Sequence, residues 1–276
     1  FNSNAPTQSE NVSVTNGITE SLRNKSKANY KINALKLDFS LPFKHLYMET
    51  GASFSAIRNK TSLMLENLAN GQWKYNVDES NEFLYKERTL AAYLSAKKLL
   101  TEKLQLQAGL RYEHTWTESN QLTQRQINRS HYGRFYPTLH LNWQLKDNQN
   151  LALAANWGIE RPNFNDLNPF RIYTSTTDYM TGNPYLTAAY TRNVEINYSN
   201  GKGLYAVLYN NHGKGEIGWR TQFLENGSQI TGPYDGLRHE KTGIYANYNR
   251  NVLTWLNLNI GGEVYYYDSH SDYKTD

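Results

Sequence analysis

Hydrophobic and polar residues alternate with a period of two along much of the chain, most clearly over residues 103–116. One face of this stretch carries Leu104, Leu106, Ala108, Leu110, Tyr112 and Trp116. The opposite face carries Lys103, Gln105, Gln107, Gly109, Arg111, Glu113 and Thr115. Because successive side chains of a strand point to opposite faces, the alternation predicts a β-strand with one apolar and one polar side. Its length exceeds that of most globular strands and suits a tilted crossing of a lipid bilayer.

Similar alternation recurs along the chain and predicts about ten or eleven strands. The patterned ranges are 28–41, 46–56, 83–96, 103–116, 135–145, 151–159, 193–198 and 204–220, followed by two strands that meet at residues 249–251. Residues 1–27 are polar and poorly defined, with one weakly patterned strand near residues 12–22. No domain boundary interrupts the series, so we expect residues 1–276 to form a single β-barrel segment.

The connections between these strands alternate between short and long. Short ones are predicted at residues 42–45, 98–102, 146–149, 199–203 and 249–251, and long polar ones at 59–81, 117–131, 161–187 and 221–238. Outer-membrane barrels have short periplasmic turns and long extracellular loops. A soluble β-sandwich does not require that alternation, and its strands are usually shorter. The pattern therefore predicts an all-β, antiparallel transmembrane β-barrel, with a soluble β-rich glycan-binding or adhesin module as the alternative.

Composition agrees with a barrel. The mean hydropathy of −0.76 by itself indicates a soluble protein, but a lumen-facing half of every strand dilutes the average of a membrane barrel. The 22 tyrosines fit aromatic girdles at the membrane surfaces. No apolar run approaches the length of a transmembrane helix. The net charge of +4, without a basic run, argues against a nucleic-acid partner.

Three cations share the apolar parity of their strands: Lys86, Arg88 and Arg192. Each lies at the long-loop end of its strand, where a lipid-facing cation costs little. One hypothesis is that they form a membrane rim that contacts anionic groups of outer-membrane lipopolysaccharide. Snorkelling side chains or solvated strand ends explain them equally well.

An ordered set of motifs adds a family resemblance. The loop after residue 160 contains Arg161, Pro162, Phe164, Leu167, Asn168, Pro169 and Phe170, then Gly182, Asn183, Pro184 and Leu186, and the next strand carries an inward Glu195. Earlier strands contain Gly109, Leu110, Arg111 and Glu113, and then Tyr136, Pro137, Thr138 and Leu139. Over about residues 37–262 this set resembles the barrel of TonB-dependent outer-membrane receptors of the kind abundant in Bacteroidetes.

That resemblance implies a 22-stranded barrel in a Gram-negative outer membrane. It also implies an N-terminal plug, energised by the TonB complex through a TonB box. The chain has no recognisable plug, no TonB box and no aromatic residue ending its last strand, so it resembles a middle-to-late part of such a barrel.

The implied function is active uptake of a scarce solute such as a siderophore, a cobalamin-like molecule or a glycan. Candidate ligand contacts are the loop aromatics Phe170, Tyr173, Tyr179 and Tyr185, and the lumenal polar residues Arg111, Glu113 and Arg161. Aromatic packing and turn chemistry are alternative explanations for these residues. A passive porin-like barrel is a further alternative, but it needs complete closure.

No enzymatic chemistry is predicted. The seven histidines are scattered and the chain has no cysteine, so no metal site is expected and no cofactor is implied. Residues 213–216 lack the hydroxyl residue of a phosphate-binding loop and are interpreted as a kink in a lumenal strand. Arg111 and Glu113, two residues apart on the polar face, are expected to form an ion pair on the lumen wall.

Overall fold

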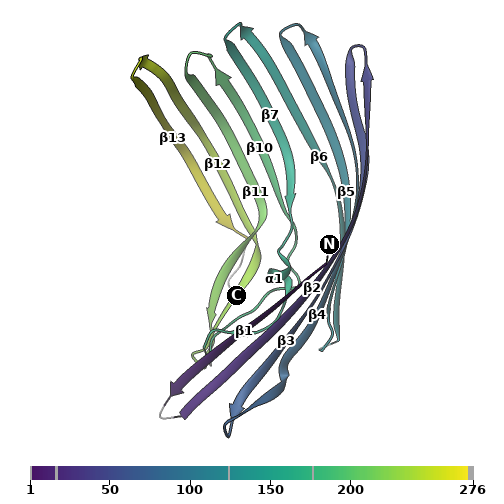
Figure 1. The fold of residues 1–276 in the computed structure, drawn as a ribbon, viewed down its shortest axis with the longest axis vertical. Coiled ribbons are helices and arrows are strands. Elements are labelled where there is room, and N and C mark those ends of the chain that lie inside the picture. Colours follow the sequence, from purple (N-terminus) through teal and green to yellow (C-terminus); the bar gives the residue numbers. More distant parts are fainter. Residues whose placement is uncertain (1, 16–17, 124, 176, 273–276) are drawn as a thin grey trace.

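The computed structural model describes residues 2–15, 18–123, 125–175 and 177–272, and in it one antiparallel sheet rolls into a partial barrel (Figure 1). Its long strands are β1 (Asn2–Thr15), β2 (Ile18–Phe43), β3 (Leu46–Ala69), β4 (Gln72–Thr101), β5 (Leu104–Gln121), β6 (Gln126–Lys146), β7 (Gln149–Glu160), β10 (Ala189–Ser199), β11 (Leu204–Phe223), β12 (Gln229–Leu253) and β13 (Leu256–Ser271). Helix α1 (Phe164–Leu167) and strands β8 (Ile172–Tyr173) and β9 (Tyr179–Met180) are short.

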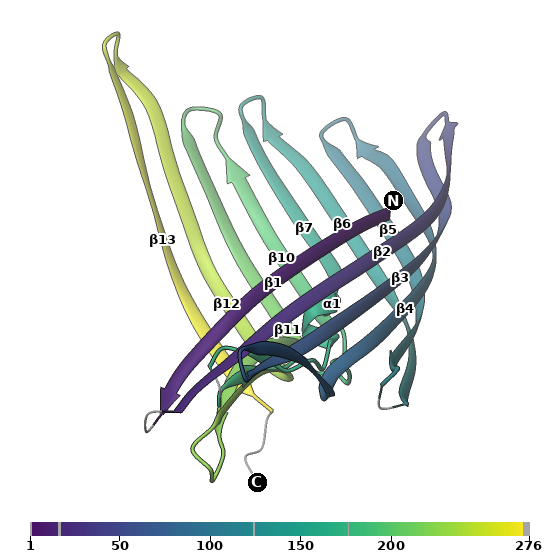
Figure 2. The ribbon, with the colours of Figure 1, turned by 60° about the horizontal axis from the view of Figure 1, so that its bottom comes forward.

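Each long strand pairs antiparallel with its neighbour in sequence, and β7 pairs with β10 across the long connection. Strands β1 and β13 form the two edges of this series, and the sheet curls between them (Figure 2). The predicted all-β, antiparallel partial barrel is therefore confirmed.

The two faces of the sheet differ as the alternation predicts. The apolar parity faces outward and is exposed, with Leu35 at 63% and Val264 at 74% of full exposure. Inward-facing polar residues such as Asn59 and Thr61 are buried. Exposed apolar and buried polar residues are the reverse of the arrangement in a soluble protein. In a bilayer this arrangement is favourable, because lipid covers the apolar face while polar groups face the lumen.

Three of the predicted long loops are wrong. Strand β3 continues to Ala69 and β4 begins at Gln72, so most of residues 59–81 is strand. Similarly, β5 and β6 extend through most of residues 117–131, and β11 and β12 through most of residues 221–238. Beyond the membrane both faces of a strand can be polar, so the alternation disappears while the backbone pairing continues.

The β3–β4 hairpin has a specific turn. Asn70 and Gly71 both adopt positive φ angles, 54° and 74°. This is the geometry of a type I′ turn, and Asn-Gly is its preferred sequence. The dipeptide was therefore a hairpin signal within a range that was expected to be a loop.

The short connections are largely as predicted. Turns at residues 44–45, 147–148 and 200–203 agree with the sequence, whereas the other two lie at 102–103 and 254–255 instead of 98–102 and 249–251. The single strand predicted at residues 12–22 is wrong, because β1 ends at Thr15 and β2 begins at Ile18. Residues 16 and 17, between them, lie outside the described residues.

The predicted long connection after β7 is confirmed, and we call residues 161–188 the interior loop. It contains α1, β8 and β9 and lies inside the curve of the sheet (Figure 1). Strand β9 pairs in parallel with β12, and β8 lies next to β2. The interior loop thus links two distant parts of the wall.

In the described part of the chain, no helix is both long and apolar enough to cross a membrane.

The pairing between β6 and β7 ends beside the interior loop. Strand β6 pairs with β7 only as far as Thr138 opposite Asn156, after which β7 continues beside β10 alone. Pro137, the next residue of β6, has no N–H to donate to a ladder, which fits the end of the pairing. The side-chain amide of Asn128, farther along β6, instead donates to the Pro184 carbonyl of the interior loop at 3.1 Å.

Candidate functional site in the barrel interior

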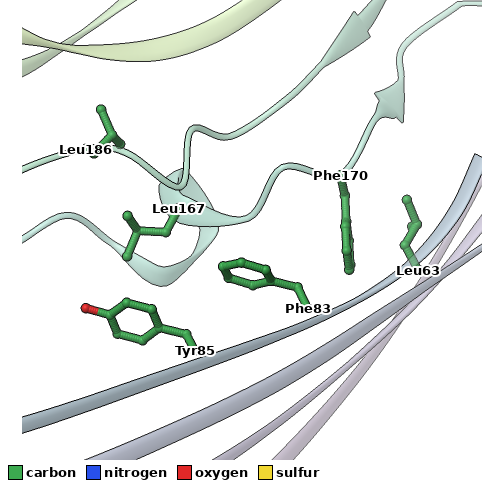
Figure 3. Close-up of a cluster of buried hydrophobic side chains, with 6 residues drawn as sticks. All are labelled: Leu63, Phe83, Tyr85, Leu167, Phe170 and Leu186. Carbon is green, nitrogen blue, oxygen red and sulfur yellow. The ribbon is translucent and has the colours of Figure 1, made fainter. Parts of the chain in front are cut away.

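The interior loop is attached to the wall by a hydrophobic cluster (Figure 3). Strands β3 and β4 contribute Leu63, Phe83 and Tyr85, and the loop contributes Leu167, Phe170 and Leu186. All six are buried, and Phe83 is completely so. Phe164 packs against this cluster, with its ring centroid 5.4 Å from that of Tyr85. Leu63, Phe83 and Tyr85 are apolar although they lie on the mostly polar lumen side of the wall, because they pack against the interior loop.

The two motifs of the interior loop contact each other through backbone hydrogen bonds. The Gly182 N–H donates to the Asn168 carbonyl at 3.0 Å, and the Asn183 N–H donates to the Asp166 carbonyl at 2.6 Å. A Cβ atom on Gly182 would lie 2.6 Å from the Asp166 carbonyl oxygen. Glycine is therefore required here for close approach of two backbone segments.

We expect Gly182→Ala to lower the stability of the folded interior loop by about 1–3 kcal/mol, because the methyl group must displace backbone atoms. Limited proteolysis of the loop measures this effect. Gly227→Ala is a control for an added methyl group with open space around it, although its positive φ adds local turn strain. Equal protection of loop residues 161–188 in Gly182→Ala and the unmodified protein would contradict the expectation.

A charged network holds the start of the interior loop. The Arg161 guanidinium donates to Glu113 on β5, and its Nε lies 3.6 Å from a Glu87 carboxylate oxygen on β4. Arg161 also donates to the Thr115 hydroxyl at 3.0 Å. Arg111 forms the predicted ion pair with Glu113. Both carboxylates are buried, so the arginines supply the charge that these groups need away from water.

Further polar contacts anchor the middle of the interior loop. The Tyr173 hydroxyl donates to the Glu79 carboxylate at 2.6 Å. Burial, together with this hydrogen bond, raises the pKa of Tyr173 to about 12, so the phenol keeps its proton at neutral pH. The Thr187 hydroxyl donates to Asp235 of β12, also at 2.6 Å. These bonds attach the loop to opposite sides of the barrel.

A cavity of about 450 Å³ lies between the interior loop and the wall. Its lining combines aromatic and polar side chains, including Asn24, Tyr30, Asn168, Phe170, Met180 and Trp219. The Asn168 side-chain oxygen is buried and has no hydrogen-bond partner among the described residues. Both the size and the mixture of apolar walls with a few polar groups are typical of small-molecule sites.

The structure separates the predicted ligand-contact residues into groups. Arg111, Glu113 and Arg161 meet in the charged network. Phe170 lines the cavity, and the Tyr173 and Tyr179 rings lie 5.5 Å apart farther along the loop. Tyr185 faces β6 on the other side of the loop, where Gln126 donates to its hydroxyl.

Several residues of this site were not predicted from the sequence. Glu87 alternates with Lys86 and Arg88, which share the parity of the outward apolar residues of β4. The alternation therefore places Glu87 on the lumen side, and this signal could have identified it from the sequence. Trp219 follows a β-bulge, where Gly215 has a φ of 76° and the β11–β12 register shifts. This bulge is the kink predicted at residues 213–216. Because a bulge interrupts the alternation of inward and outward side chains, the alternation before it does not predict which way Trp219 points.

The three predicted rim cations do not form one group. Lys86 pairs with Glu118 at 2.8 Å, and Arg88 is exposed on the same strand. Arg192 is exposed on β10, opposite Trp157 of β7. It lies near the β10 start at Ala189, at the end of the strand that follows the interior loop, as the sequence predicts.

Solved structures of outer-membrane uptake proteins share this fold. The ferric yersiniabactin uptake receptor FyuA from Yersinia pestis aligns with a TM-score of 0.57 at 16% identity, over 92% of this chain and 37% of the receptor. The copper transporter OprC gives 0.61 at 12% identity, over 92% and 40%. The ferric citrate transporter FecA gives 0.56 at 14% identity, over 92% and 39%.

These likenesses concern the fold, and the chain spans about two fifths of the length of each protein. No curated protein matches the chain by sequence. The model of the "Outer membrane protein beta-barrel family" matches residues 1–276, the whole chain. The outward apolar face, the antiparallel rolled sheet and this match agree on location in the Gram-negative outer membrane. The chain belongs to the outer membrane protein beta-barrel family.

Proposed function

We propose that this chain supplies barrel wall and a lumenal ligand site to a TonB-dependent receptor for active uptake of a scarce solute. The observation that carries the proposal is the interior cavity, formed where the interior loop is fixed against β2, β3 and β11. A loop attached at several points of the wall provides a preorganised surface, which reduces the ordering cost of ligand binding.

The lining of the cavity favours a ligand with both polar and apolar parts. Phe170 and Trp219 offer aromatic surface, and the unpartnered Asn168 oxygen offers a hydrogen-bond acceptor. Ferric siderophores, cobalamin-like molecules and glycans all combine such features. The charged network of Arg161 lies outside this lining and positions the loop, so its contribution to ligand binding is indirect.

The import mechanism and its partners rest on the motif resemblance. In this proposal a plug encoded in the same receptor contacts the TonB complex, and its movement opens a path past the interior loop. The ordered loop and strand motifs favour a receptor of the Bacteroidetes type. The solved uptake proteins support the barrel architecture on which such a mechanism depends.

Passive diffusion is the competing function. A passive pore needs an open lumen, whereas here the interior loop crosses from the β12 side to β2. Conductance of the full-length receptor in planar bilayers separates the two functions. We expect no stable open channel, and a steady ohmic conductance would favour the porin-like alternative.

The cavity is testable by fluorescence, because Trp219 lines it. We expect titration of the full-length receptor with ferric siderophores, cobalamin and oligosaccharides to yield one class that quenches tryptophan emission, since a bound ligand contacts the indole. In Trp219→Phe most of that quenching should disappear. Trp143→Phe is the matched control, because Trp143 lies on the outward face of β6.

The control should leave the quenching unchanged. Quenching that persists in Trp219→Phe would place the ligand elsewhere in the receptor. Absence of binding by all three classes, in a receptor that is correctly folded, would contradict the proposed site.

A further inference from the structure

A second pocket lies on the other side of the interior loop from the 450 Å³ cavity. Its volume is about 260 Å³, and residues of β4, β5, β6 and the interior loop line it. The hydrophobic cluster separates the two spaces. Leu63 and Phe170 line the first cavity, whereas Tyr85, Leu167 and Leu186 line the second pocket, and Figure 3 shows these two groups at opposite ends of the cluster.

The barrel wall supplies hydroxyl and amide groups to this pocket, which we call the hydroxyl pocket. Thr117 lies opposite Ser130 and Ser119 lies opposite Asn128, and all four have the lumen-facing parity of β5 and β6. The Ser119 and Ser130 hydroxyls make no hydrogen bond with any residue that the structure describes. Because a hydroxyl both donates and accepts, this side of the pocket offers several hydrogen bonds to a ligand.

The interior loop supplies the opposite side, which is largely apolar. Pro162 and Pro184 line it, together with the ring of Tyr185. Two hydrogen bonds from β6 hold this side in place: Asn128 donates to the Pro184 carbonyl at 3.1 Å, and Gln126 donates to the Tyr185 hydroxyl. The hydroxyl pocket therefore presents polar groups on one side and carbon rings on the other.

The charges at the hydroxyl pocket are paired within the protein. Two of its described lining residues are charged, Glu87 and Arg129. Glu87 accepts a hydrogen bond from the Tyr85 hydroxyl at 2.9 Å and lies 3.6 Å from Nε of Arg161. Arg129 has the outward parity of β6 and donates to Glu118 at 2.9 Å. A charged ligand would enter without a counter-charge, which is costly away from water, so the pocket favours a neutral ligand.

The size of the hydroxyl pocket limits the ligand to one small ring. Sites for drug-sized ligands measure roughly 300–1,000 Å³, and this pocket is smaller. A whole ferric siderophore or cobalamin does not fit, whereas a single sugar ring does. A sugar ring also matches both sides of the pocket, because its hydroxyls lie around the rim while its C–H groups form faces that pack on carbon rings.

We propose that the hydroxyl pocket binds one neutral sugar ring of the imported solute. The ring hydroxyls bond to Ser119 and Ser130, and a C–H face of the ring packs on Tyr185. This inference rests on the proposed import function for the arrival of the solute in the lumen. Binding itself requires neither plug movement nor the TonB complex, so it is measurable on the isolated receptor.

Saturation-transfer NMR of the full-length receptor in detergent, with the methyl glycosides of glucose, galactose and mannose, tests this site. We expect at least one glycoside to bind, and Ser119→Ala/Ser130→Ala to lower its affinity about tenfold or more, because two hydrogen bonds are lost. The matched control, Ser40→Ala/Ser55→Ala, removes two lumen-facing hydroxyls that line neither space and should change affinity less than about twofold.

Substitutions of Tyr185 separate ring packing from hydrogen bonding. Tyr185→Phe keeps the ring and should retain the affinity, whereas Tyr185→Ala should lower it about fivefold or more. Glucuronate, which carries a negative charge, should bind more weakly than methyl glucoside. Equal affinity of Tyr185→Ala and Tyr185→Phe, or tighter binding of glucuronate, would contradict the assigned chemistry.

The outcomes also separate this inference from the import proposal. Failure of all three glycosides to bind a folded receptor, checked by heat-modifiable gel mobility, or equal weakening in the two serine double variants, would overturn the sugar site. Trp219→Phe should leave glycoside binding unchanged, because Trp219 lines the other cavity. Glycoside binding without any solute that quenches Trp219 would count against the import site alone. Ser130→Ala, at an exposed position, replaces the double variant if that variant fails to fold.

Discussion

Replacing Arg161 with alanine is expected to destabilise the packed interior loop by about 3 kcal/mol, because it removes one partner of a buried ion-pair network. Glu87 would lose its only cation among the described residues, and Glu113 would retain Arg111 alone. The Glu113 side chain is only 4% exposed, so water cannot replace the lost guanidinium. The start of the interior loop should then separate from β4 and β5.

Thermal unfolding and limited proteolysis of the loop measure this effect. Arg111→Ala is the matched control, because Arg111 pairs with the same carboxylate but is half exposed, and a loss below about 1 kcal/mol is expected. Adding Glu87→Gln to Arg161→Ala should restore part of the stability, since it removes an uncompensated buried charge. Equal losses from the two arginine variants, or no recovery with Glu87→Gln, would show that the network does not hold the loop.

Phe170→Ala is expected to have an effect of similar size, about 3–5 kcal/mol on the packing of the interior loop. Phe170 is 3% exposed and packs in the cluster with Leu63 and Phe83 (Figure 3). Truncation removes its apolar contacts and leaves a void that a wall fixed by strand pairing cannot fill. The cavity beside Phe170 should enlarge, so ligand binding should also weaken.

Tyr185→Ala is the control for this variant, because Tyr185 belongs to the same loop but is 56% exposed. Its truncation should change stability by no more than about 0.5 kcal/mol. Hydrogen exchange of the backbone amides of residues 161–188 compares the two variants directly. Faster exchange in Tyr185→Ala than in Phe170→Ala would contradict the assignment of Phe170 to the packed cluster.

Alternation identified the strands where lipid acts on them. Over residues 103–116 and in the other patterned ranges, one face of the strand contacts the bilayer, so every second residue is apolar. Past the bilayer no such requirement exists. The outer halves of β3 and β4 therefore looked like loop, although their backbones pair almost as far as the turn at Asn70 and Gly71.

Within the candidate site, the sequence provided residue types and parity. It predicted the ion pair of Arg111 with Glu113, the long loop, and the kink near Gly215. It could not pair Arg161 with Glu87, because these residues are 74 positions apart and meet only when the interior loop folds back onto β4.

What the sequence by itself determined is thus the class of the protein and the direction of its side chains, since both follow from a local period of two and from the solvent on each face. Only the tertiary structure decided that Phe170 is buried while Tyr185 is exposed, that Gly182 meets Asn168, and that the hydroxyls of β5 and β6 face the prolines of the interior loop. These outcomes depend on strand register and on the path of the loop, which are set by contacts between residues far apart in the chain.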